Sequence, residues 1–124
     1  MKTYPIHSSS IEKAELAIPP KNLLHVVVQI FEAMGDPTRA KILYAIRKQE
    51  MCVTDLALLI KVSDSAISHQ LSFLKTRHLV KSRRAKNIIY YTLSFKHLSA
   101  LLREAEYYAD HLKNKLPDHP YGED

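Results

Sequence analysis

Apolar residues recur three and four positions apart along much of the chain, a spacing that places them on one face of a helix. This pattern predicts helices over residues 21–34, 54–60, 64–78 and 97–115, and one more that begins at residue 37. Two shorter runs, 80–84 and 88–93, are instead rich in Val, Ile, Tyr and Thr, which favours strands. The link between these two runs is short enough for a hairpin. We therefore expect a mainly α fold that carries a small β-hairpin.

Capping residues mark where several of these helices begin and end. Asp36 is placed to cap the helix that starts with Pro37, and Gly35 ends the helix before it. Thr54 and Ser63 each offer a hydroxyl to the free amides of a first helical turn. They open two helices joined by a short turn, and the hairpin follows at once. That order of parts is typical of a winged helix-turn-helix, which holds a DNA duplex.

The helix expected over 64–78 has two different faces. Ile67, Leu71 and Leu74 fall on one side. The opposite side carries small hydroxyls and an imidazole, with no Glu, and suits close approach to base edges and phosphates. A solvated surface gives the same pattern, so this face alone does not decide the function. Its polar members are Ser65, Ser68, His69 and Ser72.

The hairpin carries a cluster of cations, namely Lys81, Arg83, Arg84 and Lys86. Such a cluster can be a solubility device, yet beside a recognition face it favours phosphate contacts, which make binding fall steeply with salt. Arg39 lies near the start of its helix, where a phosphate contact and a surface ion pair are equally available. We therefore expect double-stranded operator DNA as the partner. The candidate DNA contacts are Ser63, Ser65, Ser68, His69, Gln70, Ser72, Lys75, Arg77, Arg83, Arg84 and Lys86.

Composition narrows the function classes further. The 124 residues, 46% of them hydrophobic, suit one small domain, and the formal charge of +5 weakly favours a polyanionic partner. The single Cys52 rules out a disulfide within the chain, and no secretory core or membrane-spanning run is seen in the sequence. We expect a cytoplasmic protein with no membrane partner. An enzyme is not expected, because two glycines exclude a Gly-rich phosphate loop and no nucleophile has a base nearby in a motif.

Three regions follow from the pattern: an N-terminal arm over 1–20, a DNA-binding and dimerisation domain over 21–116, and a C-terminal tail over 117–124. The last predicted helix carries a continuous apolar stripe. Pairing it with the equivalent helix and with 21–34 forms a homodimer and spaces two recognition helices about one DNA turn apart. Burial within its own protomer accounts for part of the stripe. Its members are Leu98, Leu101, Leu102, Ala105, Ala109, Leu112 and Leu116.

Four motifs occur in order along the chain. They are Met34 to Arg39 with Ile42-Leu43, Glu50 to Ala57, Val62-Ser63 with Ala66 to Leu71, and Leu79-Val80 leading to Tyr90-Tyr91. Together they resemble the ArsR/SmtB family of bacterial metal-responsive repressors, over roughly residues 22 to 112. The resemblance implies an α-helical core with one β-wing, and a homodimer on a near-palindromic operator. It also implies repression of genes for metal efflux or sequestration, with release when an effector binds.

Two departures from the family pattern bear on the wing and on one metal site. The family often has Gly at the hairpin tip, where we expect Asn87 to take the left-handed conformation instead. One family site uses several cysteines, but here Thr54 stands in the second cysteine position and only Cys52 remains. A thiolate cage cannot form from one protomer, which leaves Cys52 as a small buried residue or as a soft-metal or redox position.

A second family site lies on the last helix. Its positions are occupied here by Phe95, His97, Tyr108 and His111. The two histidines, with Glu104, suit Zn(II) or another divalent transition metal, and because they lie about 21 Å apart along a helix, one ion can join them only across a dimer. Ordinary surface imidazoles fit the same residues, so a repressor that answers to another signal or to none stays open. So does a winged helix used only for protein contacts, which predicts no salt-sensitive DNA binding.

Overall fold

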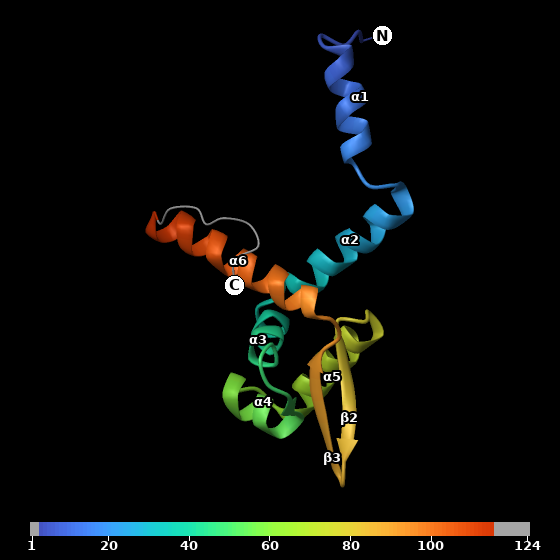
Figure 1. The fold of residues 1–124 in the computed structure, drawn as a ribbon. Coiled ribbons are helices and arrows are strands. Elements are labelled where there is room, and N and C mark those ends of the chain that lie inside the picture. The colour runs from blue at the N-terminus through green and yellow to red at the C-terminus, as the bar shows by residue number, and fades with distance from the viewer. Residues whose placement is uncertain (1–2, 116–124) are drawn as a thin grey trace.

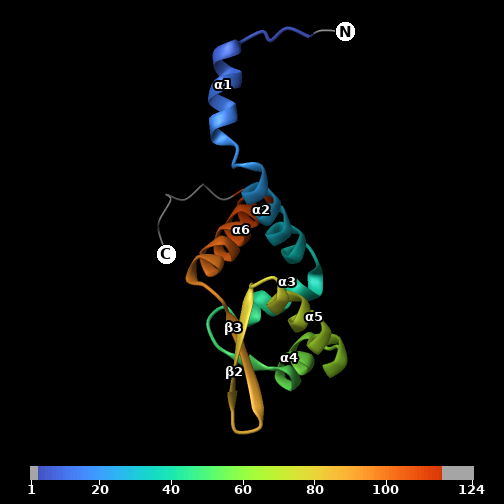
Figure 2. The same cartoon turned by 90° about the vertical axis from the view of Figure 1, so that its right-hand side faces the viewer.

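The computed structural model describes residues 3–115, whose arrangement is shown in Figure 1. Helices α3, α4 and α5 cluster beside the hairpin, while α1 extends away from them beyond the far end of α2, as Figure 2 shows from a second side. The predicted tail 117–124 and the stripe residue Leu116 lie outside the described residues. The elements are α1 (Ser8–Ala17), α2 (Lys21–Met34), α3 (Pro37–Ala45), β1 (Met51–Cys52), α4 (Val53–Ile60), α5 (Asp64–Thr76), β2 (Val80–Ala85), β3 (Ile88–Leu93) and α6 (Lys96–Asn114).

The hydrophobic core lies among α3, α4, α5 and the start of α6. Ile67, Leu71 and Leu74, which were predicted to share one side of α5, are all buried, as are Leu56 of α4 and Leu102 of α6. Each such side chain contributes roughly 1.5–3 kcal/mol when it leaves water. The helix-turn-helix is therefore stabilised within one protomer. Its largest fully buried side chains are Ile42, Leu43, Ile46, Leu56, Ile67, Leu71, Leu74 and Leu102.

The sheet is antiparallel and has the strand order β1-β3-β2. Strands β2 and β3 pair from Val80 opposite Leu93 to Ala85 opposite Ile88, which confirms the predicted hairpin. Strand β1 pairs with β3 and was not predicted, because two residues are too few to show an alternating pattern. At the tip it is Lys86, with φ of 57°, that takes the left-handed conformation, so the prediction for Asn87 was wrong.

Two of the three predicted caps are confirmed. The carboxylate of Asp36 accepts from the backbone N–H of Arg39 at 3.0 Å, and the hydroxyl of Ser63 accepts from that of Ala66 at 3.0 Å. The prediction for Thr54 was wrong, because α4 begins one residue earlier and Thr54 lies inside its first turn. Its hydroxyl instead donates to Oδ2 of Asp64 at 3.2 Å, a contact that links α4 to α5.

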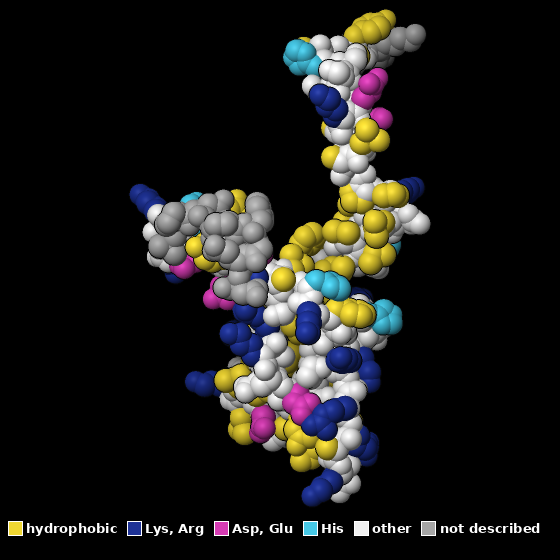
Figure 3. Space-filling view, viewed as in Figure 1, with side chains coloured by type: hydrophobic (Ala, Val, Ile, Leu, Met, Phe, Trp, Pro, Cys, Tyr) yellow, Lys and Arg dark blue, Asp and Glu magenta, His cyan; other side chains and the backbone are white. Residues whose placement is uncertain are grey.

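Much apolar surface lies outside this core, on α1, α2 and α6. Helix α1 has no buried residue, and α2 has Ala33 alone. Figure 3 shows hydrophobic side chains along both helices. On the stripe of α6, Leu98 and Leu102 are buried while Leu112 is 65% exposed. One protomer therefore covers only the first part of the stripe.

None of the helices within residues 3–115 combines the length and the apolar content needed to cross a membrane.

Candidate nucleic-acid interface

Helix α5 presents the polar face that the sequence predicted. Ser65, Ser68, His69 and Ser72 are all exposed, and the capping hydroxyl of Ser63 lies at its N-terminus. Short side chains on an exposed helix let the backbone come close to the base edges of a major groove. The face is therefore shaped for groove contact rather than for packing inside the protomer.

Gln70, also predicted to contact DNA, is half-buried and held by Arg39. Nη1 of Arg39 donates to Oε1 of Gln70 at 3.3 Å. The same guanidinium donates to the carbonyl oxygens of Ala33 at 2.7 Å and Glu32 at 3.4 Å, and its central carbon lies 4.2 Å from the ring centroid of Phe73. Arg39 is thus engaged inside the protein, an arrangement that neither alternative drawn from the sequence included.

Two predicted cations near the end of α5 are held along its surface. Arg77 donates to the carbonyl oxygen of Phe73 at 3.2 Å, with its guanidinium carbon 3.5 Å from the ring centroid. Nζ of Lys75 donates to the hydroxyl of Ser82 on β2 at 2.8 Å. Both cations remain exposed. Their stems are positioned while their charges stay at the surface, within reach of a phosphate.

The wing carries the other predicted cations, which are not equivalent. Arg84 and Lys86 are exposed, and Figure 3 shows Lys and Arg side chains gathered over this end of the molecule. Arg83 instead forms a two-pronged ion pair with Glu50, in which Nε lies 2.7 Å from Oε2 and Nη2 contacts Oε1. Its guanidinium carbon also lies 5.0 Å from the ring centroid of Tyr90.

This ion pair changes the acid–base behaviour of both partners. The hydrogen bond from Arg83 holds the pKa of Glu50 below its ordinary value of 4.5, and the same bond raises the pKa of Arg83. Because Glu50 immediately precedes β1, the ion pair links β2 of the wing to the start of β1. Arg83 is therefore a wing anchor, and any phosphate it contacts has to share a guanidinium that Glu50 already engages.

A hollow of about 580 Å³ lies between α4, α5 and the wing. Ser68 of the recognition face lines it together with Asn87 and Tyr90 of the wing. The half-buried Cys52 lines it as well, with its thiol free. Residues that the sequence placed separately on a helix and on a hairpin therefore share one concave surface. Cys52, expected as a small buried residue or as a soft-metal or redox position, is only half-buried, because it precedes α4 at the edge of the sheet.

The predicted metal ligands do not meet within one protomer. His97 is exposed and stacks on Phe95, with ring centroids 5.4 Å apart and the planes 5° from parallel. His111, on the last turn of α6, has a buried Nδ1 that makes no hydrogen bond. Glu104 lies between them and is half-buried. Across residues 3–115 no group of three or more His, Cys, Asp or Glu is placed to hold a metal ion.

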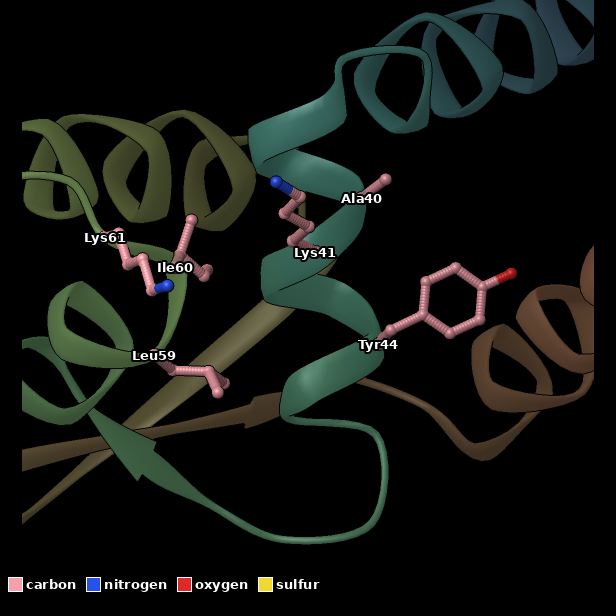
Figure 4. A pocket seen from close by; sticks show the side chains of 6 residues that line it. All are labelled: Ala40, Lys41, Tyr44, Leu59, Ile60 and Lys61. Atoms are coloured by element: carbon pink, nitrogen blue, oxygen red, sulfur yellow. The ribbon is translucent and has the colours of Figure 1, made fainter.

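A second hollow, of about 560 Å³, lies between α3 and α4 and contains no residue predicted to bind DNA or metal. Figure 4 shows Leu59 and the two lysines around it. The hydroxyl of Tyr44 points away from it and donates to the carbonyl oxygen of Leu102 at 2.6 Å. Burial raises the pKa of Tyr44, and the nearby Glu106 adds to this effect. This hydrogen bond joins α3 to α6.

Sequence reasoning missed the residues that hold the predicted cations in place. Phe73 and Arg77 are four positions apart on one helix, a spacing that does signal a side-chain contact. Glu50 and Arg83 are 33 positions apart, and Arg39 and Gln70 are 31 apart. No local sequence pattern predicts such contacts, because they depend on how the helices and strands pack against one another.

Comparison with known proteins agrees with this geometry. A family model described as "Bacterial regulatory protein, arsR family" matches residues 36–82, which contain α3, α4, α5 and the start of the wing. A transcriptional repressor SmtB homolog from Synechocystis is 37% identical over 108 residues, which are 87% of this chain and 80% of the relative. A cadmium resistance transcriptional regulatory protein CadC homolog from Staphylococcus aureus is 33% identical over 101 residues, 81% of this chain and 83% of the relative.

A solved structure shows the same fold. It is a homodimeric winged helix-turn-helix DNA-binding domain from Mycobacterium bovis, with a TM-score of 0.73 and 24% identity, and the match covers 80% of this chain and 92% of that one. The predicted fold class, mainly α with a winged helix-turn-helix, is confirmed. The expectation of a regulator rather than an enzyme is confirmed by the two relatives, both of which are transcriptional regulators.

Proposed function

Because the chain belongs to the ArsR/SmtB family of bacterial transcriptional regulators, we propose that it is a homodimeric repressor of a near-palindromic operator. The observation that carries this proposal is the exposed outer face of α5, which bears hydroxyls and an imidazole beside the cations of the wing. Such a surface can form hydrogen bonds with base edges and ion pairs with phosphates. Since the operator lies on bacterial DNA, the site of action is the cytoplasm.

In this proposal the two parts of the interface have different tasks. Ser65, Ser68, His69 and Ser72 meet base edges in the major groove and supply sequence preference. Lys75, Arg77, Arg84 and Lys86 meet phosphates and supply affinity that depends on salt, with Arg83 contributing while it anchors the wing. Ser63 and Gln70 stand at the margins of the contact, one as a cap and the other bound to Arg39.

The dimer is proposed to form through α2 and α6. The exposed apolar side chains of these helices supply the surface that a partner would cover, and they include Leu23, Val28 and Phe31 of α2 and Tyr107, Tyr108 and Leu112 of α6. A two-fold axis through this contact presents the two copies of α5 to successive major grooves.

The proposed effector is a divalent metal ion, zinc or a neighbour of it in coordination chemistry. The name of the CadC homolog, a cadmium resistance regulator, supports a metal signal. In this chain His97, Glu104 and His111 would hold the ion, with donors from two protomers, and the unbonded buried Nδ1 of His111 suits a ligand. An ion bound across the dimer would supply a cross-link that depends on the relative position of the two α6 helices.

A second candidate is a family member that has lost the metal site and responds to another signal or to none. Two residues favour it, Phe95, which stacks on His97, and Tyr108, because each occupies a position where the family resemblance implies a ligand. Phenylalanine offers no donor atom, and tyrosine is a rare ligand for these ions.

A metal titration distinguishes the two candidates. The purified, reduced protein is bound to a duplex that it has itself selected from a random-sequence library, and Zn(II), Ni(II), Co(II) and Cd(II) are added in turn. Release by one of these ions in the wild type, and loss of release in both His97→Ala and His111→Ala, is the expected result. Release that persists in both variants moves the ligands elsewhere, and no release with any ion favours the second candidate. Because the sequence leaves Cys52 open as a soft-metal position, Cys52→Ser is included, and it is expected to respond like the wild type.

A further inference from the structure

Arg39 makes contacts with the end of α2 and with the recognition helix at the same time. We propose that Arg39 is a positioning residue that fixes the angle of α5 against α2, and thereby sets the spacing of the half-sites that the dimer accepts. The inference rests on the proposed function, because it assumes a dimer formed through α2 that binds DNA through α5.

The contact with α2 uses carbonyl groups of its last turn, where the usual backbone donors of the helix interior are missing. Glu32 and Ala33 lie in this turn, and the carbonyl oxygen of Glu32 also accepts from the backbone N–H of Gly35 at 3.2 Å. Nε of Arg39 donates to the carbonyl oxygen of Ala33 at 2.7 Å, and Nη2 donates to that of Glu32 at 3.4 Å. A cation at a helix C-terminus is also favoured by the helix dipole. This side of the guanidinium is therefore firmly placed.

The contact with α5 uses the remaining part of the same planar group. Nη1 donates to Oε1 of Gln70, and the guanidinium carbon lies 4.2 Å from the ring centroid of Phe73. Gln70 and Phe73 are three residues apart, so they lie on one side of the helix. One fork thus holds two carbonyls of α2 and two side chains of α5.

The origin of the side chain is fixed as well. The backbone N–H of Arg39 donates to the capping carboxylate of Asp36 at 3.0 Å, at the start of α3. The chain between α2 and α3 consists of Gly35 and Asp36, and this short link alone leaves the angle between the helices open to change. Arg39 spans the junction and reaches the recognition helix beyond it.

The consequence for DNA binding follows from two-fold symmetry. In a dimer joined through α2, any rotation of α5 relative to α2 is repeated in the second protomer, so the distance between the two recognition helices changes twice over. Half-site spacing mirrors that distance. Arg39 therefore acts on which operators fit, through helix position and without a base contact of its own.

The test uses the self-selected duplex and versions of it with the half-sites one base pair closer and one base pair further apart. The ratio of affinities for the original and altered spacings is measured for the wild type and for Arg39→Lys. Lysine keeps the charge at the end of α2 but lacks the planar fork. The wild type is expected to bind the original spacing more tightly than the altered ones. In Arg39→Lys this ratio of affinities is expected to fall about tenfold, which is the effect of removing one charge-assisted hydrogen bond.

Arg77→Lys is the matched control. Arg77 also lies against the Phe73 ring, but its hydrogen bond goes to the carbonyl oxygen of Phe73 on its own helix. The control is expected to shift affinity for all three duplexes together and to leave the spacing ratio unchanged. Phe73→Leu removes the ring under the guanidinium and keeps an apolar side chain, and it is expected to lower the ratio as Arg39→Lys does. If Arg39→Lys does not fold, the spacing ratio of Phe73→Leu tests the proposal in its place.

Each outcome bears on a different part of the inference. A wild type that binds all three spacings equally overturns it and leaves DNA binding standing. The same holds if folded Arg39→Lys keeps the full spacing preference. A wild type that binds no duplex overturns the proposed function, and the inference with it.

Discussion

The helix-turn-helix body, formed by α3, α4 and α5, buries its inward apolar residues, whereas the outer helices α1, α2 and α6 leave many of theirs exposed. In α3, α4 and α5 the inward leucines and isoleucines are fully buried, whereas Leu16 of α1 is 89% exposed and Leu112 of α6 is 65% exposed. The body therefore has a core of its own, while the outer helices carry apolar surface that this protomer does not cover. The helix-turn-helix body is thus stable by its own core, whereas the outer helices supply the apolar surface of the proposed dimer contact. The two regions meet at residues such as Arg39 and Tyr44.

The sharpest way to test the contrast is to remove a leucine from each region. Leu71→Ala truncates a fully buried side chain and is expected to lower the free energy of unfolding by about 2–5 kcal/mol, because apolar burial is lost and a cavity is left behind. Leu16→Ala on α1 is expected to change the free energy of unfolding by less than about 0.5 kcal/mol. Urea unfolding followed by circular dichroism, at one fixed protein concentration, measures both. Equal losses at the two positions would remove the distinction between the regions.

The next largest effect concerns assembly. Leu112→Glu places a charge where the proposed dimer buries an apolar side chain, and it is expected to weaken dimerisation by about 2 kcal/mol, or roughly 30-fold. Leu58→Glu on α4 is the control, since Leu58 is 74% exposed and belongs to the body. Sedimentation velocity across a dilution series gives the dimer dissociation constant for each variant. A wild type that sediments as a monomer at all concentrations contradicts the proposed dimer.

A smaller effect separates the two kinds of residue in the DNA interface. Arg84→Ala is expected to weaken binding to every duplex and to reduce the salt dependence by about one unit, in line with one lost phosphate contact. Ser68→Ala is expected to lower the preference for the selected duplex by more than it lowers general affinity. Fluorescence anisotropy over a series of salt concentrations measures both quantities. Equal losses on all sequences for Ser68→Ala would refute its base-reading role.

The smallest effect is a local response of the wing to acid. Because Arg83 lowers the pKa of Glu50, the ion pair contributes stability that is complete above the ordinary pKa of 4.5 and is lost as the pH falls through the lowered folded value. Amide hydrogen exchange in β1 and β3 is therefore expected to speed up below pH 4.5, relative to the amides of the α5 core. Glu50→Gln is expected to remove that pH dependence. A wing whose exchange follows the core at every pH, in the wild type, argues against the tie.

The elements with strong periodicity could be predicted from the sequence, while the contacts between elements could not. Residues such as Ile67 and Leu71 reveal the inner face of α5 because helical spacing alone sets which side they lie on. The N-cap predicted at Thr54 lies two residues after the observed N-cap, Cys52, and the Thr54 hydroxyl bonds Asp64 of the next helix instead of an amide of its own. At the wing tip, a two-residue turn placed the left-handed conformation on Lys86 and not on Asn87.

The candidate site divides along the same line. The exposure of the hydroxyls and cations on α5 and the wing could be predicted, because it follows from residue type and spacing. Arg83 was predicted as a phosphate contact on charge alone. Its partner Glu50 precedes β1, on the other side of β3 from β2, so only the folded sheet brings the two side chains together. The metal ligands were predicted from a resemblance, and they stay a proposal because His97 and His111 need a second protomer to meet.

Recognition of DNA by α5 and the wing is tested by measuring how tightly the protein binds its self-selected duplex and a scrambled duplex of equal length over a range of salt concentrations. We expect tighter binding to the selected duplex at every salt concentration, and a logarithm of affinity that falls linearly with the logarithm of salt by about 0.9 for each phosphate contacted. Equal affinity for both duplexes, or no binding even at the lowest salt concentration, would contradict it.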